Sequence, residues 1–107
     1  MISNETIFIT GGAGFIGATL AGKLIDSNKI VVFDNFARNS PQTTGLVGHP
    51  NLTVVNGDIR DGHAVTSAVL AAQPDRIVHC AAIAGIDTVI KSPTTTLDVN
   101  IVGTANI

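Results

Sequence analysis

Four short apolar runs, rich in β-branched residues, alternate along the chain with segments that have helical periodicity. The runs cover residues 6–10, 30–33, 52–55 and 76–80. They are apolar nearly throughout instead of alternating, which is typical of parallel strands covered on both faces. The pattern therefore predicts four parallel strands.

Helical patterns separate most of these runs. The first has apolar residues at every fourth position, with two more beside them: Ile16, Leu20, Leu24, Ala21 and Ile25. Asn28 is its predicted stop, because Asn tolerates the left-handed capping conformation. The second helix is predicted to begin at an Asp61 N-cap and to end before Pro74, which disfavours helical geometry at Gln73.

The remaining segments are predicted to be less regular. Residues 35–51 are rich in Ser, Pro, Thr and Gly and lack periodicity, which predicts a loop. Residues 81–91 are expected to be a connection, and Ser92-Pro93 an N-cap followed by proline at the first helical position. The helix that follows is expected to carry on one face Leu97, Asn100, Ile101 and Thr104.

This succession of strands and helices predicts the first half of a Rossmann-type, doubly wound parallel sheet in the α/β class. We expect about four strands, with helices on both faces. At 107 residues, 45% of them hydrophobic, the chain has room for one domain with a substantial core.

Residues 10–17, Thr-Gly-Gly-Ala-Gly-Phe-Ile-Gly, join the first strand to the first helix. A helix N-terminus offers unpaired backbone N–H groups and the positive end of the helix dipole, so it is suited to bind a pyrophosphate. Gly11 lets the chain turn off the strand, Gly14 lets phosphate oxygens approach the backbone, and Gly17 lets the helix pack close to the sheet. The stretch predicts a dinucleotide site; a glycine turn that serves only packing is the alternative.

Asp34 closes the second strand, where a carboxylate of this fold accepts hydrogen bonds from the adenosine ribose. A 2′-phosphate about 4 Å from it would meet roughly 4 kcal/mol of repulsion at an effective dielectric near 20. A third of that energy is about tenfold in affinity, so Asp34 favours NAD over NADP. A solvated aspartate is the alternative, and the Arg38 guanidinium could instead accept a 2′-phosphate.

Charge and composition argue against other function classes. The net charge is −2 with no basic cluster, so nucleic-acid binding is not expected. The single cysteine, Cys80, cannot form an internal disulfide, and no apolar run approaches the length that spans a membrane. Residues 1–5 lack the pattern of a signal peptide. We therefore expect a soluble, cytoplasmic protein that does not bind a membrane, and we predict no metal site.

Five motifs occur in the order and approximate spacing of the extended short-chain dehydrogenase/reductases. They are residues 10–17, Asp34-Asn35, Asp58-Ile59, His79-Cys80-Ala81-Ala82 and Asn100-Ile101-Val102-Gly103-Thr104. Over its whole length the chain resembles the NAD-dependent sugar-nucleotide epimerases and dehydratases, among them UDP-glucose 4-epimerase. The resemblance implies a full-length enzyme that binds NAD and a nucleotide-sugar substrate and forms a homodimer.

The same resemblance implies roles for individual residues at the cofactor. The Phe15-Ile16 pair would flank the pyrophosphate turn, and the Asp34-Asn35 pair would hold the adenosine ribose. Asp58 and the backbone of Ile59 would read the adenine edge, because a carboxylate accepts from the amino group and a backbone N–H donates to the adjacent ring nitrogen.

Three more residues belong to the implied cofactor site, namely Ala81, Ala82 and Asn100. The two alanines follow the fourth strand, beside the reversal of strand order where open α/β sheets bind ligands, although core alanines are the alternative. Asn100 is a polar amide on an otherwise apolar helix face, and the resemblance implies a place near the cofactor and the catalytic centre. Gly103, inside the same helix, suggests the close approach of another backbone.

Other residues carry less information about the reaction. His79 is predicted to anchor a strand end, and Cys80 to be an inert buried thiol. The 4-epimerases often have a lysine at the position of Ala84. The 4,6-dehydratases have Glu-Ser-His at the positions of residues 83–85, and they share the aspartate found here as Asp87. The sugar and the outcome of the reaction therefore stay open.

The composition contains no tyrosine. The resemblance implies a catalytic tyrosine, its pKa lowered by a lysine, that takes a hydroxyl proton as hydride leaves for NAD. We therefore expect residues 1–107 to be an NAD-binding Rossmann domain that is truncated on its C-terminal side, lacks a substrate domain and catalytic residues, and is inactive alone. The alternatives are a non-catalytic NAD(P)-binding sensor of the same fold and an NADP-dependent reductase of the same superfamily.

Overall fold

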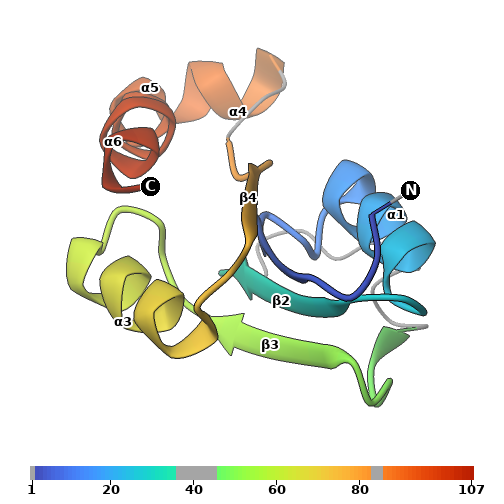
Figure 1. Cartoon of the computed structure of the whole chain (residues 1–107). Helices are drawn as coiled ribbons and strands as arrows, with labels where there is room; N and C mark the ends of the chain where they lie inside the picture. The colour runs from blue at the N-terminus through green and yellow to red at the C-terminus, as the bar shows by residue number, and fades with distance from the viewer. Residues whose placement is uncertain (1, 36–45, 83–85) are drawn as a thin grey trace.

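A four-stranded parallel sheet in the order β3-β2-β1-β4 forms the centre of the computed structural model, which describes residues 2–35, 46–82 and 86–107 (Figure 1). Its strands are β1 (Thr6–Thr10), β2 (Lys29–Asp34), β3 (Leu52–Asn56) and β4 (Arg76–His79). Each agrees with its predicted run to within one residue. Because this order is the first half of a doubly wound sheet, the predicted fold class is confirmed.

Helices cover both faces of the sheet (Figure 1). Helix α1 (Phe15–Leu24) packs on one face, where it forms a core with Ile7, Ile9, Ile30 and Val32. Helix α3 (Gly62–Ala72) packs on the other face, and this second core contains Phe8, Val31, Phe33, Ile59, Val65, Ala68 and Val99. Consecutive residues of β1 thus enter opposite cores, as the two-residue period of a strand requires.

The expectation that all four strands are covered on both faces is correct only for β1 and β2. Among the residues that the structure describes, strand β3 has no strand on its outer side and exposes most of its residues, and β4 exposes Arg76 and Ile77. The two central strands are buried along most of their length. The apolar composition of a strand therefore does not distinguish a central strand from an edge strand here.

The ends of the first two helices are set by side chains and backbone together. Asn28 ends α1 through its buried side chain, which donates to the carbonyl oxygen of Leu24 at 2.9 Å. The predicted left-handed backbone conformation of Asn28 is not found. The Asp61 side chain caps α3 as predicted, accepting from two backbone N–H groups. At the other end of α3, Gln73 adopts a left-handed conformation, so the helix stops before Pro74 as expected.

The C-terminal segment differs most from expectation. Its elements are α4 (Ile86–Lys91), α5 (Pro93–Leu97), the π-helix η1 (Asp98–Gly103) and α6 (Thr104–Asn106). Helix α4 lies where a connection was predicted. Residues 86–91 are rich in β-branched side chains, which have low helix propensity, and tertiary structure overrides this weak local preference. Helix α5 does begin at Pro93 after a Ser92 N-cap, as predicted.

The helix face expected to carry Leu97, Asn100, Ile101 and Thr104 is largely exposed. Thr96, Val99 and Gly103 are buried, whereas Leu97 and Ile101 are 58% and 63% exposed. The buried positions follow the ordinary helical spacing of three to four residues, so the apolar character of Leu97 and Ile101 did not indicate which face of the helix is buried. Among the predictions for loops, those that concern residues 36–45 and 83–85, Arg38 and Ala84 included, lie outside the described residues.

Candidate functional site

The glycine turn after β1 is held against both neighbouring strands. Gly11 has a φ of +69°, and its N–H donates to the carbonyl oxygen of Phe33 in β2 at 2.9 Å. A Cβ at Gly11 would lie 2.7 Å from the backbone nitrogen of Ala81, which follows β4. Glycine is therefore required here both for the left-handed turn, as predicted, and for the approach of the β4 end.

Close packing around this turn explains two more of its glycines. A Cβ at Gly17 would clash with the carbonyl oxygen of Gly11 and lie 2.7 Å from the Cα of Gly12. Gly17 therefore lets the start of α1 pack close to the glycine turn, whereas the sequence predicted that it lets the helix pack close to the sheet. A Cβ at Gly12 would lie 2.7 Å from the Val32 side chain. Sequence reasoning assigned no role to Gly12, although its place directly after a turn glycine was a signal.

Gly14 and the first turn of α1 have a different character. Gly14 is the N-cap, and a Cβ there would meet only the carbonyl oxygen of Gly11, at 3.3 Å. No side chain among the described residues caps this helix, so the N–H groups of its first turn are left for an external acceptor. Phe15 and Ile16, in this first turn, are 69% and 71% exposed.

Asp34 connects three loops at the carboxyl edge of the sheet. Its Oδ2 accepts from the N–H of Ala13 in the glycine turn at 3.0 Å, and its backbone oxygen accepts from the N–H of Gly57 after β3 at 3.0 Å. The residue is half-buried at the end of β2, and Asn35 beyond it is exposed. The structure therefore brings the predicted carboxylate directly against the predicted phosphate turn.

The loop after β3 holds Asp58 in an ion pair with Arg60. The guanidinium donates to both carboxylate oxygens over 2.6 to 3.1 Å, and the Arg60 N–H donates to Oδ1 at 2.9 Å. These hydrogen bonds lower the pKa of Asp58, so its carboxylate is charged at neutral pH. Sequence reasoning missed Arg60, although its two-residue distance from Asp58 was visible.

The loop after β3 is also hydrogen-bonded to the C-terminal helix α6. The amide nitrogen of Asn106 donates to the carbonyl oxygens of Ile59 and Arg60, both at 3.0 Å. A Cβ at Gly103 would lie 2.9 Å from Cγ2 of Ile59. Gly103 therefore makes room for a side chain, whereas the sequence suggested the close approach of another backbone. Asn106 was missed because no local pattern links it to a loop 46 residues away in sequence.

The end of β4 is joined to the end of β1. The backbone N–H groups of Cys80 and Ala81 donate to the carbonyl oxygen and the hydroxyl of Thr10, at 2.9 and 3.2 Å. Burial raises the pKa of the Cys80 thiol, in keeping with the predicted inert role. Ala82, next along the chain, is exposed.

His79 anchors this strand end, as predicted. Its Nδ1 lies 2.5 Å from Oγ1 of Thr10 and its Nε2 lies 2.9 Å from Oγ1 of Thr104. Burial lowers the pKa of its ring. Asn100 is half-buried in η1, where its carbonyl oxygen accepts from the Thr104 hydroxyl at 2.6 Å.

The glycine turn, Asp34, the loop at Asp58 and the end of β4 all follow carboxyl ends of parallel strands, so they share one edge of the sheet. A protein-family model described as GDP-mannose 4,6 dehydratase matches residues 8–107, nearly the whole chain. The chain belongs to this family. The resemblance to sugar-nucleotide epimerases and dehydratases is thereby confirmed.

Relatives in the family have several reactions in their names. CDP-paratose 2-epimerase of Salmonella typhi is 33% identical over 104 residues, which cover 94% of this chain and 31% of that protein. UDP-glucuronic acid decarboxylase 3 of Arabidopsis thaliana is 36% identical over 107 residues, which cover 97% and 29%. This chain of the family thus spans less than a third of the length of these relatives.

Solved structures share the fold as well. The Bordetella bronchiseptica enzyme WbmH in complex with NAD⁺ matches with a TM-score of 0.82 and 36% identity, over 95% of this chain and 33% of that one. Epimerase Mth375 of Methanothermobacter thermautotrophicus matches with a TM-score of 0.86 and 26% identity, over 97% and 30%.

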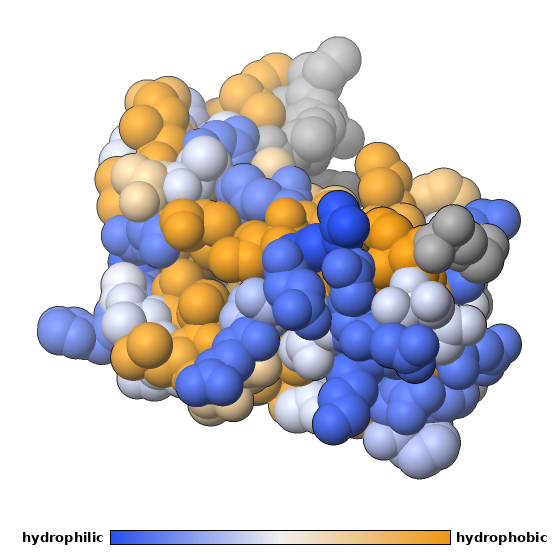
Figure 2. Space-filling view, in the orientation of Figure 1, coloured by the Kyte–Doolittle hydropathy of each residue, from blue (hydrophilic) through white to orange (hydrophobic). Residues whose placement is uncertain are grey.

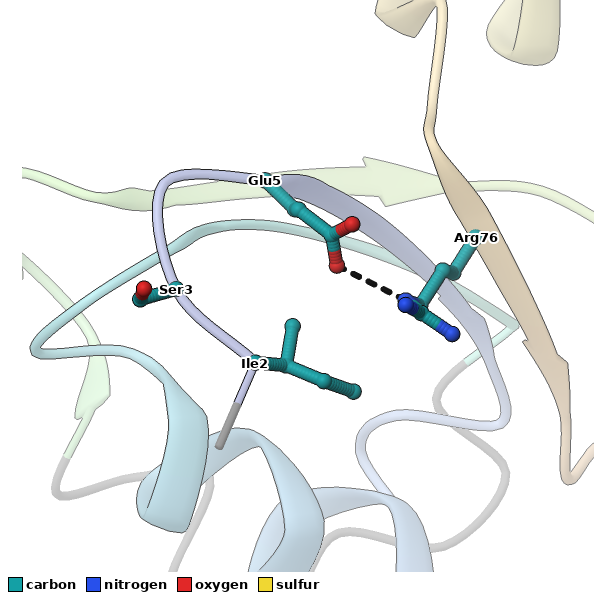
Figure 3. Close-up of a pocket in the computed structure, with 4 residues that line it drawn as sticks. All are labelled: Ile2, Ser3, Glu5 and Arg76. Atoms are coloured by element: carbon teal, nitrogen blue, oxygen red, sulfur yellow. Dashed lines mark hydrogen bonds and ion pairs between the residues drawn. The ribbon is translucent and has the colours of Figure 1, made fainter.

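A surface hollow lies at the opposite, amino edge of the sheet (Figure 3). It is lined by Ile2, Ser3, Glu5 and Arg76, and the Arg76 guanidinium donates to Glu5 at 2.7 Å. Neither the glycine turn nor Asp34 contributes to it. Within the described part of the chain there is no cluster of metal-binding side chains and no helix long and apolar enough to cross a membrane.

Proposed function

We propose that residues 1–107 are the N-terminal, NAD-binding domain of a sugar-nucleotide epimerase or dehydratase, with the substrate domain outside this chain. The observation that supports the proposal most strongly is the hydrogen bond between Asp34 and Ala13. It joins a carboxylate suited to a ribose to a turn suited to a pyrophosphate.

The residues present fit a dinucleotide. The first turn of α1 offers backbone N–H groups to the phosphates. Gly11 and Gly17 let this turn pack closely at the sheet edge, and Gly14 leaves space for the dinucleotide. The space at Gly14 matters most, because a side chain there would separate phosphate oxygens from the backbone. Phe15 and Ile16 flank this turn in the proposal, with their exposed side chains beside the phosphates.

Asp34 selects NAD over NADP in this proposal. Its hydrogen bond to Ala13 holds the charged carboxylate beside the turn, where a 2′-phosphate would be repelled and two ribose hydroxyls would be bound. Asn35 would add a polar group to the same ribose. An NADP-dependent reductase would need a cation that outweighs Asp34.

The loop after β3 would bind the adenine. Asp58 would accept from the amino group, and the backbone N–H of Ile59 would donate to the adjacent ring nitrogen. Arg60 and Asn106 support this assignment, because they fix the carboxylate and the loop backbone from two sides. Ala81, Ala82 and Asn100 would line the other half of the cofactor, where small side chains let it lie against the backbone.

When bound, NAD would supply a hydride acceptor for a sugar carbon and later return the hydride. The chain's own residues would bind and orient the cofactor, since the sequence has no tyrosine to take the hydroxyl proton. We therefore propose that this chain alone turns over no nucleotide sugar, and that the full-length protein adds the tyrosine and lysine and forms a homodimer. The second candidate is a non-catalytic NAD sensor of the same fold, which would keep the glycine turn and lack the catalytic tyrosine over its full length.

Two measurements test the proposal. Calorimetric titration of a longer protein that contains the chain should show NAD binding at least about tenfold tighter than NADP binding, as the repulsion at Asp34 requires. An assay for conversion of UDP-, GDP-, CDP- and dTDP-hexoses to product should be silent for the chain and positive for a longer protein that contains it; product is measured because the returned hydride leaves no net NADH. A silent longer protein that still binds NAD would favour the sensor, whereas turnover by the chain would contradict the proposed mechanism.

A further inference from the structure

His79 bridges two segments that are far apart in sequence. One ring nitrogen contacts Thr10, the last residue of β1 before the glycine turn, and the other contacts Thr104, the first residue of α6. Thr10 is completely buried, and the imidazole is half-buried. A single side chain thus connects the phosphate turn to the helical segment that carries Asn100.

The hydroxyl groups fix the direction of these hydrogen bonds. The Thr104 hydroxyl donates its only hydrogen to the carbonyl oxygen of Asn100 at 2.6 Å, so it must accept from Nε2–H of His79. A neutral ring protonated at Nε2 has a free acceptor at Nδ1, and the Thr10 hydroxyl donates to it. The same hydroxyl accepts from the N–H of Ala81 at 3.2 Å.

This gives one continuous chain of hydrogen bonds with every donor and acceptor matched. It runs from the Ala81 N–H through Thr10, His79 and Thr104 to the carbonyl oxygen of Asn100. The two residues at the ends of this hydrogen-bond series, Ala81 and Asn100, belong to the cofactor site proposed above. In the alternative tautomer Nε2 would carry no hydrogen, and it would face the Thr104 oxygen as a second acceptor, because the Thr104 hydroxyl already donates to Asn100.

We propose that His79, held as the neutral Nε2–H tautomer between Thr10 and Thr104, is a positioning residue that sets the glycine turn and the Ala81 backbone relative to the Asn100 helix for cofactor binding. The inference rests on the proposed function. His79 itself touches no cofactor in this account and acts through its two threonine partners.

The test uses Thr104, which is exposed, so that its replacement should leave the fold intact. Thr104→Val removes the hydroxyl at nearly constant shape, and we expect NAD to bind at least about threefold more weakly while the melting temperature changes little. Thr104→Ser restores the hydroxyl and should recover most of the affinity. Thr66→Val on the exposed surface of α3 is the matched control, with unchanged NAD binding.

A double-mutant cycle separates positioning through His79 from a local effect on the helix. His79→Asn keeps an acceptor for Thr10 but is too short to reach Thr104, so Thr104→Val should cost no further affinity in this background. Long-range ¹H–¹⁵N spectra of the unmodified chain at pH 7.5 provide an independent measurement. They should show His79 protonated only at Nε2, whereas the exposed His63 should exchange between tautomers.

Three results would overturn the inference. They are a protonated Nδ1 in neutral His79, equal NAD affinity of Thr104→Val and the unmodified chain, or full additivity in the cycle. Each leaves the proposed function intact as long as the unmodified chain binds NAD. Failure of a longer protein that contains the chain to bind NAD would instead refute the proposed function, and this inference with it.

Discussion

Asp34 and Ala13 are joined by a hydrogen bond of 3.0 Å between the carboxylate Oδ2 and the backbone N–H. Because Ala13 lies within the glycine turn and Asp34 ends β2, this bond fixes the distance between the proposed phosphate and ribose subsites. It also gives the carboxylate a structural task besides its electrostatic one. The two tasks can be separated by substitution.

Asp34→Asn removes the charge but keeps an oxygen that accepts from Ala13. We expect the preference for NAD over NADP, at least about tenfold in the unmodified chain, to narrow to a few-fold, with little change in melting temperature. Asp34→Ala should narrow the preference equally and also lower the melting temperature, because the Ala13 N–H loses its partner. Calorimetry and thermal unfolding measure both effects. An undiminished preference in Asp34→Asn would show that the charge does not select the cofactor.

Three glycine-to-alanine variants should separate folding from binding. Gly17→Ala places a Cβ against the backbone of the glycine turn, so we expect a loss of about 1–3 kcal/mol in the free energy of unfolding. Gly14→Ala meets only the Gly11 oxygen at 3.3 Å and should fold while NAD binding weakens markedly. A Cβ added at Gly22 would meet no atom of another part of the described structure within 4 Å, so Gly22→Ala should stabilise α1 by up to about 1 kcal/mol.

Urea unfolding and NAD titration of these variants provide the comparison. Gly22→Ala is the control in both experiments, because it lies in the same helix away from the proposed phosphates. If Gly14→Ala and Gly22→Ala bind NAD equally well, the open space at Gly14 does not serve a phosphate.

His79 should make stability depend on pH. Burial lowers its pKa below the ordinary value of 6.5, so the unfolded chain takes up the proton first as pH falls. The contribution of His79 is therefore fully present above about pH 6.5 and is lost as pH falls toward the lower pKa of the folded state. We expect urea midpoints at pH 7.5 and 5.5 to differ more for the unmodified chain than for His79→Asn. A smaller difference for the unmodified chain would mean that folding raises this pKa.

The chain by itself should be marginally stable or self-associating. Strand β4 lies at a sheet edge with Ile77 exposed. Apolar surface lies over the C-terminal helices at the upper left of Figure 2, and Leu97 and Ile101 of this segment are exposed. Sedimentation velocity over a range of concentrations should detect association. Ile77→Lys should reduce it if the strand edge is responsible, and Ile101→Lys if the helices are. A sharp, concentration-independent unfolding transition of a monomer would contradict this prediction.

The strands and the first two helices could be predicted because their signals are local. The Asp61 cap and Pro74 define α3 within one segment of sequence, and apolar runs define the strands. The C-terminal segment could not be predicted in the same way. The apolar residues Leu97 and Ile101 lie on its exposed face, and α4 forms from residues with low helix propensity.

Site residues divide along the same line. The glycine turn and Asp34 could be predicted because each occupies a defined place in a strand-turn-helix pattern. Asn106 and Thr104 act through contacts that only the folded chain creates, with the loop after β3 and with the end of β4. The pair of Arg60 and Asp58 is local instead, and was missed although its spacing is visible in the sequence. The clash that makes Gly17 necessary also depends on how the helix returns onto the turn, so its partner was misassigned.

The position of NAD on the chain is the most direct test of the account. Backbone ¹H–¹⁵N spectra recorded during titration with NAD would locate the site residue by residue. We predict that the largest shifts fall at residues 11–17, 34–35, 57–60 and 81–82, at the carboxyl edge of the sheet. Shifts confined to the hollow around Ile2 and Arg76 at the opposite edge, or no shifts at millimolar NAD, would contradict it.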